Sequence, residues 1–248
     1  MESGVPRSAR ARFLTAIGRR GQERGAPALL CEVCVDVLPV QHAAIAIHVA
    51  GSGLEVLCAS DDVAERLEWA QITLGEGPAI EAIASGGPMV APDLTAPNRR
   101  WPNFAAEATG AGVGALYAVP LEIGAIRVGV LNLYRDAPAA LNTRDFADVI
   151  TVAELITSVL LTVGSTGRIT EALDPWWDQP LSTREVHQAT GMIVAQLGVS
   201  AQEAYVRMQG YAYSRGRMLS DVAHEVVQRR LRFDPDPDAD PAGMPAHS

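Results

Sequence analysis

The sequence predicts an α+β protein, with an N-terminal antiparallel sheet and flanking helices followed by an all-α module of three helices. The sheet is predicted by two pairs of strand-like apolar runs, each pair joined by a very short turn that contains glycine. Strands joined by tight hairpins are antiparallel, which rules out a doubly wound parallel sheet. The helices are predicted by apolar residues that recur every three or four positions, both around the strands and again after residue 181.

Each element of the first domain has a local signal. Residues 1–25 are predicted to be a loose basic arm, with helical potential over 8–18. Asp62 and Glu65 stand in capping spacing, Gly75-Glu76-Gly77-Pro78 breaks the chain, and Asn142 with Asp145 caps a long helix. The elements expected for the domain at 26–163 are helices over 26–38, 61–69, 78–84, 103–109 and 143–163, and strands over 43–49, 54–59, 88–91, 115–122 and 127–134.

The three-helix module is predicted over 181–233, after a linker at 164–180 that contains Trp176-Trp177. Its helices are expected over 183–197, 201–215 and 219–231. Ser182 with Glu185 and Ser200 with Glu203 read as capping boxes, and Gly198 stands where a helix commonly ends. Residues 234–248 are predicted to be a disordered acidic tail, because the alternating Asp and Pro over 234–238, followed by Asp240-Pro241, build neither a helix nor a core.

Charge divides the chain in the same way. Residues 31–180 carry seven Arg against nineteen acidic residues, whereas residues 181–232 carry seven Arg against four, a net of +3. A basic helical unit attached to an acidic body suggests an output module for a polyanion. All twenty basic residues are Arg, which excludes a Schiff-base lysine and a phosphate-loop lysine.

The sequence offers little for catalysis or for a metal. No HExxH, HxE or GxSxG spacing is present, so we expect no catalytic residues, no metal site, no cofactor and no enzyme activity. The three cysteines, Cys31, Cys34 and Cys58, lie in apolar runs and are expected to be buried thiols. The longest apolar stretch, Val149 to Val163, contains Glu154 and is shorter than a membrane span, and no secretory signal is evident, so a cytoplasmic protein is expected.

The C-terminal module resembles the ANTAR domain. The resemblance rests on the run from Arg184 to Ile193, on Ser200 to Ala204, and on Leu219-Ser220-Asp221-Val222-Ala223. It implies RNA binding, since ANTAR proteins are bacterial antiterminators that hold a paired stem-loop in nascent mRNA. This chain has Thr190 where many relatives place a Lys, and Ala189 and Gly191 are expected to let helices approach closely. The residues expected to contact RNA are Arg184, His187, Gln188, Thr190, Gly191, Arg207, Arg215 and Arg217.

The first domain resembles a GAF domain. The resemblance rests on Leu74-Gly75-Glu76-Gly77-Pro78, on Arg100-Trp101-Pro102, and on Val119-Pro120-Leu121 leading into Gly129-Val130-Leu131. It implies a homodimer and a small-molecule ligand, which the sequence does not identify. The combination is similar to actinobacterial GAF–ANTAR regulators, and the function expected is transcription antitermination.

Two alternatives remain open at this point. One is a DNA-binding regulator that uses the same helices, and the acidic Asp221 near the start of the third helix disfavours it. The other is a GAF-fold thiol enzyme or redox sensor that uses Cys58.

Overall fold

The structure is a computed structural model that describes residues 8–20, 26–49, 53–97, 99–124, 126–164 and 180–234. It divides into two compact units, Met1–Thr183 and Arg184–Ser248, which are described separately. The predicted linker with Trp176-Trp177, and the acidic tail beyond Asp234, lie outside the described residues.

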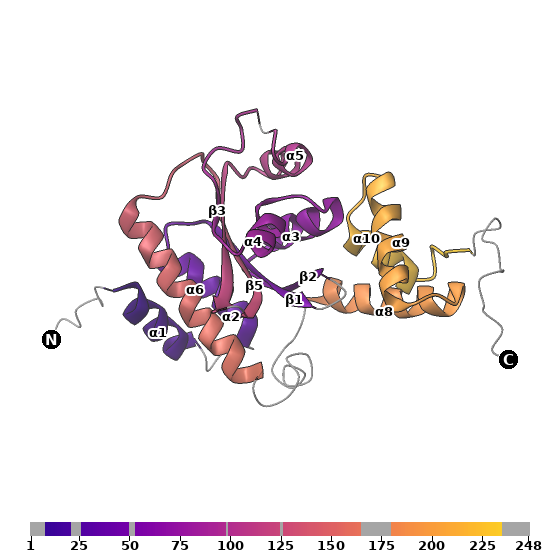
Figure 1. The fold of residues 1–248 in the computed structure, drawn as a ribbon, viewed down its shortest axis with the longest axis horizontal. Helices are drawn as coiled ribbons and strands as arrows, with labels where there is room; N and C mark the ends of the chain where they lie inside the picture. Colours follow the sequence, from indigo (N-terminus) through magenta and orange to yellow (C-terminus); the bar gives the residue numbers. More distant parts are fainter. Residues whose placement is uncertain are drawn as a thin grey trace. The chain divides into compact units, whose positions relative to one another are not determined.

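The first unit is built on one antiparallel sheet (Figure 1). Its strands are β1 (His42–Val49), β2 (Gly53–Ala59), β3 (Met89–Ala91), β4 (Ala115–Ile123) and β5 (Ile126–Arg135). The five strands are arranged in the order β2-β1-β5-β4-β3, with β1 paired to β5 in the middle. The predicted α+β class is therefore confirmed, and the two hairpins, β1–β2 and β4–β5, are the local pairs that the sequence indicated.

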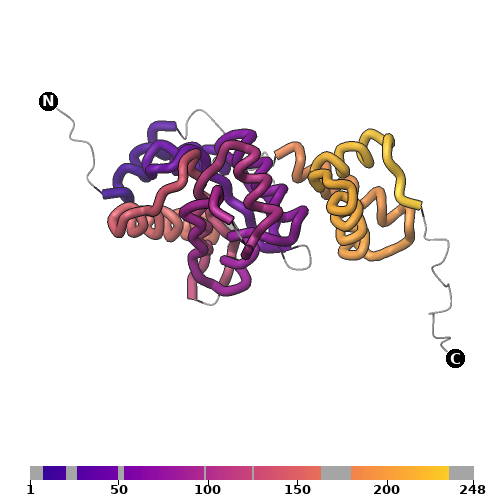
Figure 2. Tube along the Cα trace, turned by 90° about the horizontal axis from the view of Figure 1, so that it is seen from above, coloured from indigo at the N-terminus to yellow at the C-terminus, as the bar shows by residue number. Residues whose placement is uncertain are grey.

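Helices cover both faces of this sheet (Figures 1 and 2). They are α1 (Ala9–Arg20), α2 (Ala26–Val37), α3 (Asp62–Leu74), α4 (Pro78–Ser85), α5 (Pro102–Gly110) and α6 (Thr143–Gly164). The helices α2 and α6 pack on one face, and α1 lies against both of them; α3 and α4 pack on the other face, with α5 against α3. Apolar residues fill the layer between the sheet and α1, α2 and α6, which forms the main core.

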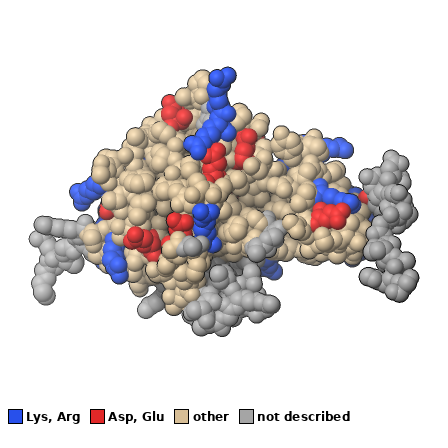
Figure 3. Space-filling model, in the orientation of Figure 1, with Lys and Arg blue, Asp and Glu red and all other residues tan. Residues whose placement is uncertain are grey.

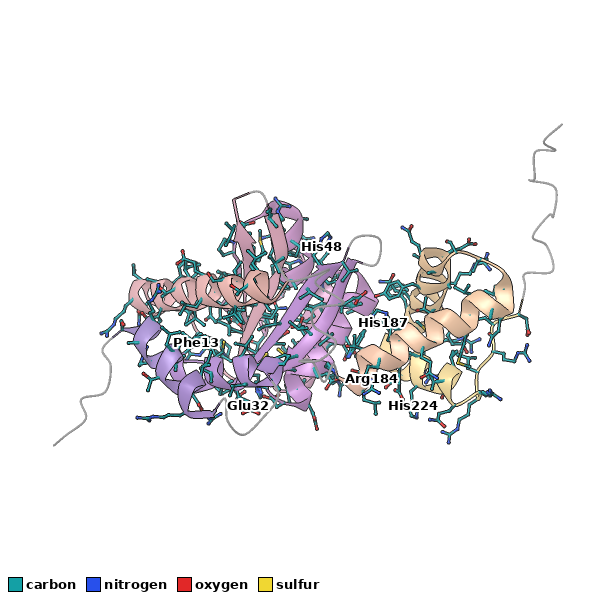
Figure 4. All side chains as sticks on the ribbon, turned by 90° about the horizontal axis from the view of Figure 1, so that it is seen from below. Phe13, Glu32, His48, Arg184, His187 and His224 are labelled. Atoms are coloured by element: carbon teal, nitrogen blue, oxygen red, sulfur yellow. The ribbon has the colours of Figure 1, made fainter. Side chains whose placement is uncertain are left out.

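The helix expected over 8–18 is present as α1 (Ala9–Arg20), but it is packed on its neighbours and is not part of a loose arm. Phe13 is fully buried in the core, and Figure 4 shows its side chain on the inner side of α1. Arg12 pairs with Asp148 of α6 at 3.0 Å, and Arg20 pairs with Glu32 and Asp36 of α2. The Arg-rich surface of α1 thus binds the acidic edges of its neighbours, while its apolar stripe completes the core.

The cap of α3 differs by one residue from the prediction. Asp61, and not Asp62, accepts the backbone N–H of Ala64 at 2.9 Å, and Gly75 ends the helix with φ of +63°. The helix therefore runs on past Trp69, which places Gln71 over the sheet. The cap of α6 is as predicted, because Asn142 accepts the N–H of Asp145 at 2.9 Å.

The second unit holds α9 (Ala201–Ser214), α10 (Leu219–Val227) and all but the first three residues of α8 (Leu181–Leu197). Ser200 accepts the N–H of Glu203 and Gly198 adopts φ of +69°, both as predicted. One expectation is wrong: α10 ends at Val227 rather than near residue 231. Its small core is made by Val186, Ala189, Ile193, Ala204, Met208, Ala212, Leu219, Val222, Ala223 and Val226.

The chain after α10 is held by a contact that the sequence did not indicate. Arg229 turns the backbone with φ of +58°. Phe233 then returns to the bundle, where its N–H donates to Gln196 at 3.0 Å and its ring meets Tyr211 edge-on at 5.4 Å. Arg229, Arg230 and Arg232 therefore lie on an exposed turn rather than on α10.

Ser182 does not cap α8, contrary to expectation. It stands inside the helix and belongs to the first unit, where its hydroxyl accepts from the indole N–H of Trp69 at 3.2 Å and donates to Glu65. Its expected partner, Glu185, contacts Nδ1 of His224 on α10 at 2.9 Å instead. This second pair joins two helices of the C-terminal unit.

Candidate functional site

One exposed face of α8 carries half of the residues predicted to bind RNA. Arg184, His187, Gln188 and Gly191 are all exposed, and their spacing of three, one and three residues places them on the same side of the helix. Figure 4 shows Arg184 and His187 on this helix. We call these four residues the α8 face.

Gly191 lies on the α8 face and not between helices, which corrects its expected role. A Cβ built at this position would meet nothing within 4 Å among the described residues, so their packing does not require a glycine there. Ala189, by contrast, is fully buried in the small core of the unit. Because glycine inside a helix costs about 1 kcal/mol relative to alanine, the open backbone at Gly191 is suited to contact with a partner.

Thr190 is turned toward its own helix. Its hydroxyl donates to the carbonyl of Val186 at 2.8 Å, and the side chain is half-buried. It therefore lies beside the α8 face and does not extend from it as a long basic side chain would.

The three predicted arginines that follow α8 are engaged with neighbouring side chains. Arg207 pairs with Glu203 one turn earlier on α9 at 2.8 Å, and Arg217 pairs with Glu225 of α10 at 2.8 Å. The hydrogen bond from Arg217 lowers the pKa of the Glu225 carboxyl. Arg215 is exposed and lies over the ring of Tyr211 at 5.2 Å. On the face drawn in Figure 3, blue and red side chains of this unit stand next to each other rather than forming a continuous blue patch.

A second exposed stripe, on α9, was not anticipated. Val206, Gly210 and Tyr213 are spaced by four and three residues, and Val206 and Tyr213 are 56% and 57% exposed. Gly210 resembles Gly191 in that a Cβ there would meet nothing within 4 Å. The signal was present in the sequence, because these residues lie opposite the buried stripe of Ala204, Met208 and Ala212.

The first unit buries a cluster of polar side chains between α3 and the sheet. Glu68 is 1% exposed and accepts from the amide of Asn132 at 2.8 Å and from the hydroxyl of Tyr134. Gln71 donates to the same hydroxyl at 3.4 Å and accepts the N–H of Ala79 at 2.8 Å. We call Glu68, Gln71, Asn132 and Tyr134 the polar cluster.

Burial raises the pKa of the Glu68 carboxyl to about 7, against the opposing effect of hydrogen bonds from Tyr134 and Asn132. The pKa of Tyr134 is raised well above its ordinary value, first by burial and then by the nearby carboxyl. Oδ1 of Asn132 has no hydrogen-bond partner among the described residues. The polar cluster thus holds a buried carboxyl whose pKa lies near neutral pH.

Comparison with known families decides what these two units are. The model of the GAF domain family matches residues 28–160, which is more than half of the chain, and the model of the ANTAR domain matches residues 180–227. The chain belongs to the GAF domain family. Its C-terminal unit carries an ANTAR domain, so a sensory domain is joined to a regulatory output domain. The strands and the polar cluster described above belong to the GAF domain, and the α8 face belongs to the ANTAR domain.

Several solved structures are similar to this chain at low identity. The GAF domain of a phosphoenolpyruvate-protein phosphotransferase from Acinetobacter matches with a TM-score of 0.48 and 10% identity, over 64% of this chain and 96% of that chain. The corresponding domain from Coxiella burnetii matches with a TM-score of 0.48 and 14% identity, over 63% and 97%. A structure of fRMsr of Staphylococcus aureus matches with a TM-score of 0.44 and 14% identity, over 64% and 98%. No curated protein matches this chain.

The three cysteines of the GAF domain are all free and buried, in agreement with the sequence prediction. Cys58, at 3% exposed, lies in the core. Within the described residues, no group of three or more His, Cys, Asp and Glu side chains is placed to hold a metal ion. No described helix combines the length and apolar character that a membrane crossing needs.

Proposed function

We propose that this protein is a cytoplasmic transcription antitermination regulator whose ANTAR domain binds stem-loops in nascent mRNA. The observation that supports this most directly is the α8 face, where Arg184, His187 and Gln188 surround a backbone left open by Gly191. Arginine and amide side chains donate to phosphates and base edges, and an open backbone allows a phosphate to come close. In this proposal the protein is a regulator and not an enzyme.

The other residues predicted to contact RNA have a secondary role in binding. Arg215 is exposed beside Tyr211, and Arg207 and Arg217 exchange their carboxylate partners for phosphates when RNA binds. Thr190 contributes through its position beside the α8 face. The proposal includes a homodimer, in which two ANTAR domains bind paired RNA loops. A small-molecule ligand of the GAF domain then shifts the equilibrium between the dimer conformations that bind RNA and those that do not.

A salt-controlled binding titration of the full-length protein tests the proposal. The probes are a leader RNA with two stem-loops, a scrambled RNA of equal length and a DNA duplex of matched sequence. Selective binding to the stem-loop RNA supports antitermination, and binding should weaken with salt because phosphate contacts release counterions. Equal binding to all three probes would refute it, and preference for the duplex would favour a DNA-binding regulator.

Matched arginine variants then locate the interface. Arg215→Ala should weaken RNA binding and reduce the slope of log K against log salt by about 1, as expected for a lost phosphate contact. The control is Arg66→Ala, which removes an exposed arginine paired with Glu107 on the GAF domain. An equal loss in both variants would mean that net charge, and not the ANTAR surface, governs binding.

A further inference from the structure

Two cysteine thiols from distant parts of the GAF domain meet in its core. Sγ of Cys31 on α2 lies 2.8 Å from Sγ of Cys58 on β2, and both thiols are free. The separation in a disulfide is about 2.05 Å. The two sulfurs are therefore close to bonding distance.

A β-bulge in β2 orients the side chain of Cys58 toward Cys31. Cys58 is opposite Ile45 of β1, whereas Val56 is opposite Ala46, so Leu57 is an extra residue in β2. Side chains normally alternate between the two faces of a strand, and an inserted residue resets that alternation. Cys58 consequently joins Ile45 in the core beneath α2, where Cys31 is also located.

The third cysteine, Cys34, is an internal control for a bond between the other two. Cys34 stands on α2 one turn after Cys31 and is fully buried. Burial raises the pKa of the Cys31 and Cys34 thiols, which favours their neutral forms. Cys58 is the most exposed of the three, at 3%, and lies on β2, which is an edge strand of the sheet. An oxidant therefore reaches Cys58 most easily, through opening of that edge.

We propose that Cys31 and Cys58 form a reversible disulfide when the protein meets a hydroperoxide. Sγ of Cys58 attacks the peroxide, so that an S–O bond forms, the O–O bond breaks, and the leaving alkoxide takes the thiol proton as an alcohol, or the leaving hydroxide takes it as water when the oxidant is hydrogen peroxide. Sγ of Cys31 then attacks Sγ of Cys58; the S–S bond forms, the S–O bond breaks, and water leaves with the second thiol proton. The two thiols lose two electrons and the peroxide gains them. The bond ties α2 to the edge strand β2.

The test uses the full-length protein and does not depend on RNA. Protein is treated with hydrogen peroxide, unfolded in guanidinium with iodoacetamide and digested with a Glu-specific protease. This enzyme separates all three thiols, because Glu32 lies between Cys31 and Cys34 and Glu55 lies between Cys34 and Cys58. The expected product is a Cys31–Cys58 linked peptide pair, about 2 Da lighter than the two reduced peptides, with Cys34 alkylated. Dithiothreitol should abolish it.

Three variants and one reference sample make the outcome decisive. Cys34→Ala should leave the link intact, while Cys31→Ala and Cys58→Ala should each remove it. Protein unfolded before peroxide treatment shows that the oxidant is active on these cysteines. A link through Cys34, a link between two chains, or three alkylated thiols in folded protein beside linked thiols in the unfolded reference would each overturn the proposal.

Discussion

The hydroxyl of Tyr134 donates a hydrogen bond to the carboxyl of Glu68 in the interior of the GAF domain. The two residues come from β5 and α3, and neither is more than 1% exposed. Asn132, also on β5, donates to the other oxygen of the same carboxyl. These two hydrogen bonds tie Glu68 of α3 to the sheet. A carboxyl in such a place couples folding to proton binding.

Ionisation of Glu68 should destabilise the domain. Burial raises its pKa from 4.5 to about 7, so between these values the folded state binds more protons than the unfolded state. The free energy of unfolding should therefore fall as pH rises through this window and then level off above it. In Glu68→Gln this part of the fall should disappear. Urea unfolding of the wild-type protein and of Glu68→Gln from pH 4.5 to 8 measures this difference, and Glu107→Gln, on the surface, is the control. Equal slopes of the unfolding free energy against pH in all three proteins would contradict the assignment.

Phe13 should contribute to stability as a core residue, although it precedes the domain predicted from the sequence. Phe13→Ala should lower the free energy of unfolding by about 3 kcal/mol or more, as deletion of a buried aromatic ring usually does. Its neighbour Leu14 is 49% exposed, so Leu14→Ala should change stability by about 0.5 kcal/mol or less. Urea denaturation compares the two, and a similar small effect of both would show that α1 does not support the core.

Alanine substitutions at Gly191 and Gly210 distinguish an effect on stability from an effect on RNA binding. Both have open space where a Cβ would be, so replacing either with alanine should raise the free energy of unfolding by up to about 1 kcal/mol. If RNA approaches the α8 face, Gly191→Ala should weaken its binding despite the gain in stability. Thermal unfolding and RNA titration are measured on the same samples. Unchanged affinity for Gly191→Ala would remove the α8 backbone from the proposed interface.

The ANTAR unit should need the chain as far as Phe233. A protein ended after Val227 loses the contacts of Phe233 with Tyr211 and Gln196, and its C-terminal unit should be less stable by about 1–2 kcal/mol. A protein ended after Phe233 should match the full chain. Hydrogen exchange at the amides of α8 and α9 reports the difference, and equal protection in both shortened proteins would contradict it.

Elements whose signal is local were predicted well from the sequence. The hairpin strands, α2, α6 and the Ser200 cap follow from nearby residues, and His187 and Gln188 are exposed on α8 as their helical spacing indicated. What escaped prediction depends on distant partners. The packing of α1 requires Asp148, the polar cluster joins Glu68 to Asn132, and the position of Cys58 depends on a bulge at Leu57. Gly191 was assigned to packing because a sequence does not reveal which side of a helix a neighbour covers. The domain boundaries and the actinobacterial type remain predictions.

The pairing of β1 with β5 bears on how the chain folds as it leaves the ribosome. β1 ends at Val49, but its central partner begins only at Ile126, and α6, which closes the core, ends at Gly164. Most of the GAF domain must therefore be synthesised before its sheet can close, because contacts between distant segments form late. The ANTAR helices contact one another over short stretches of chain and can fold as soon as they emerge. In a nascent protein, the ANTAR domain is thus synthesised only after all residues of the GAF domain have been made.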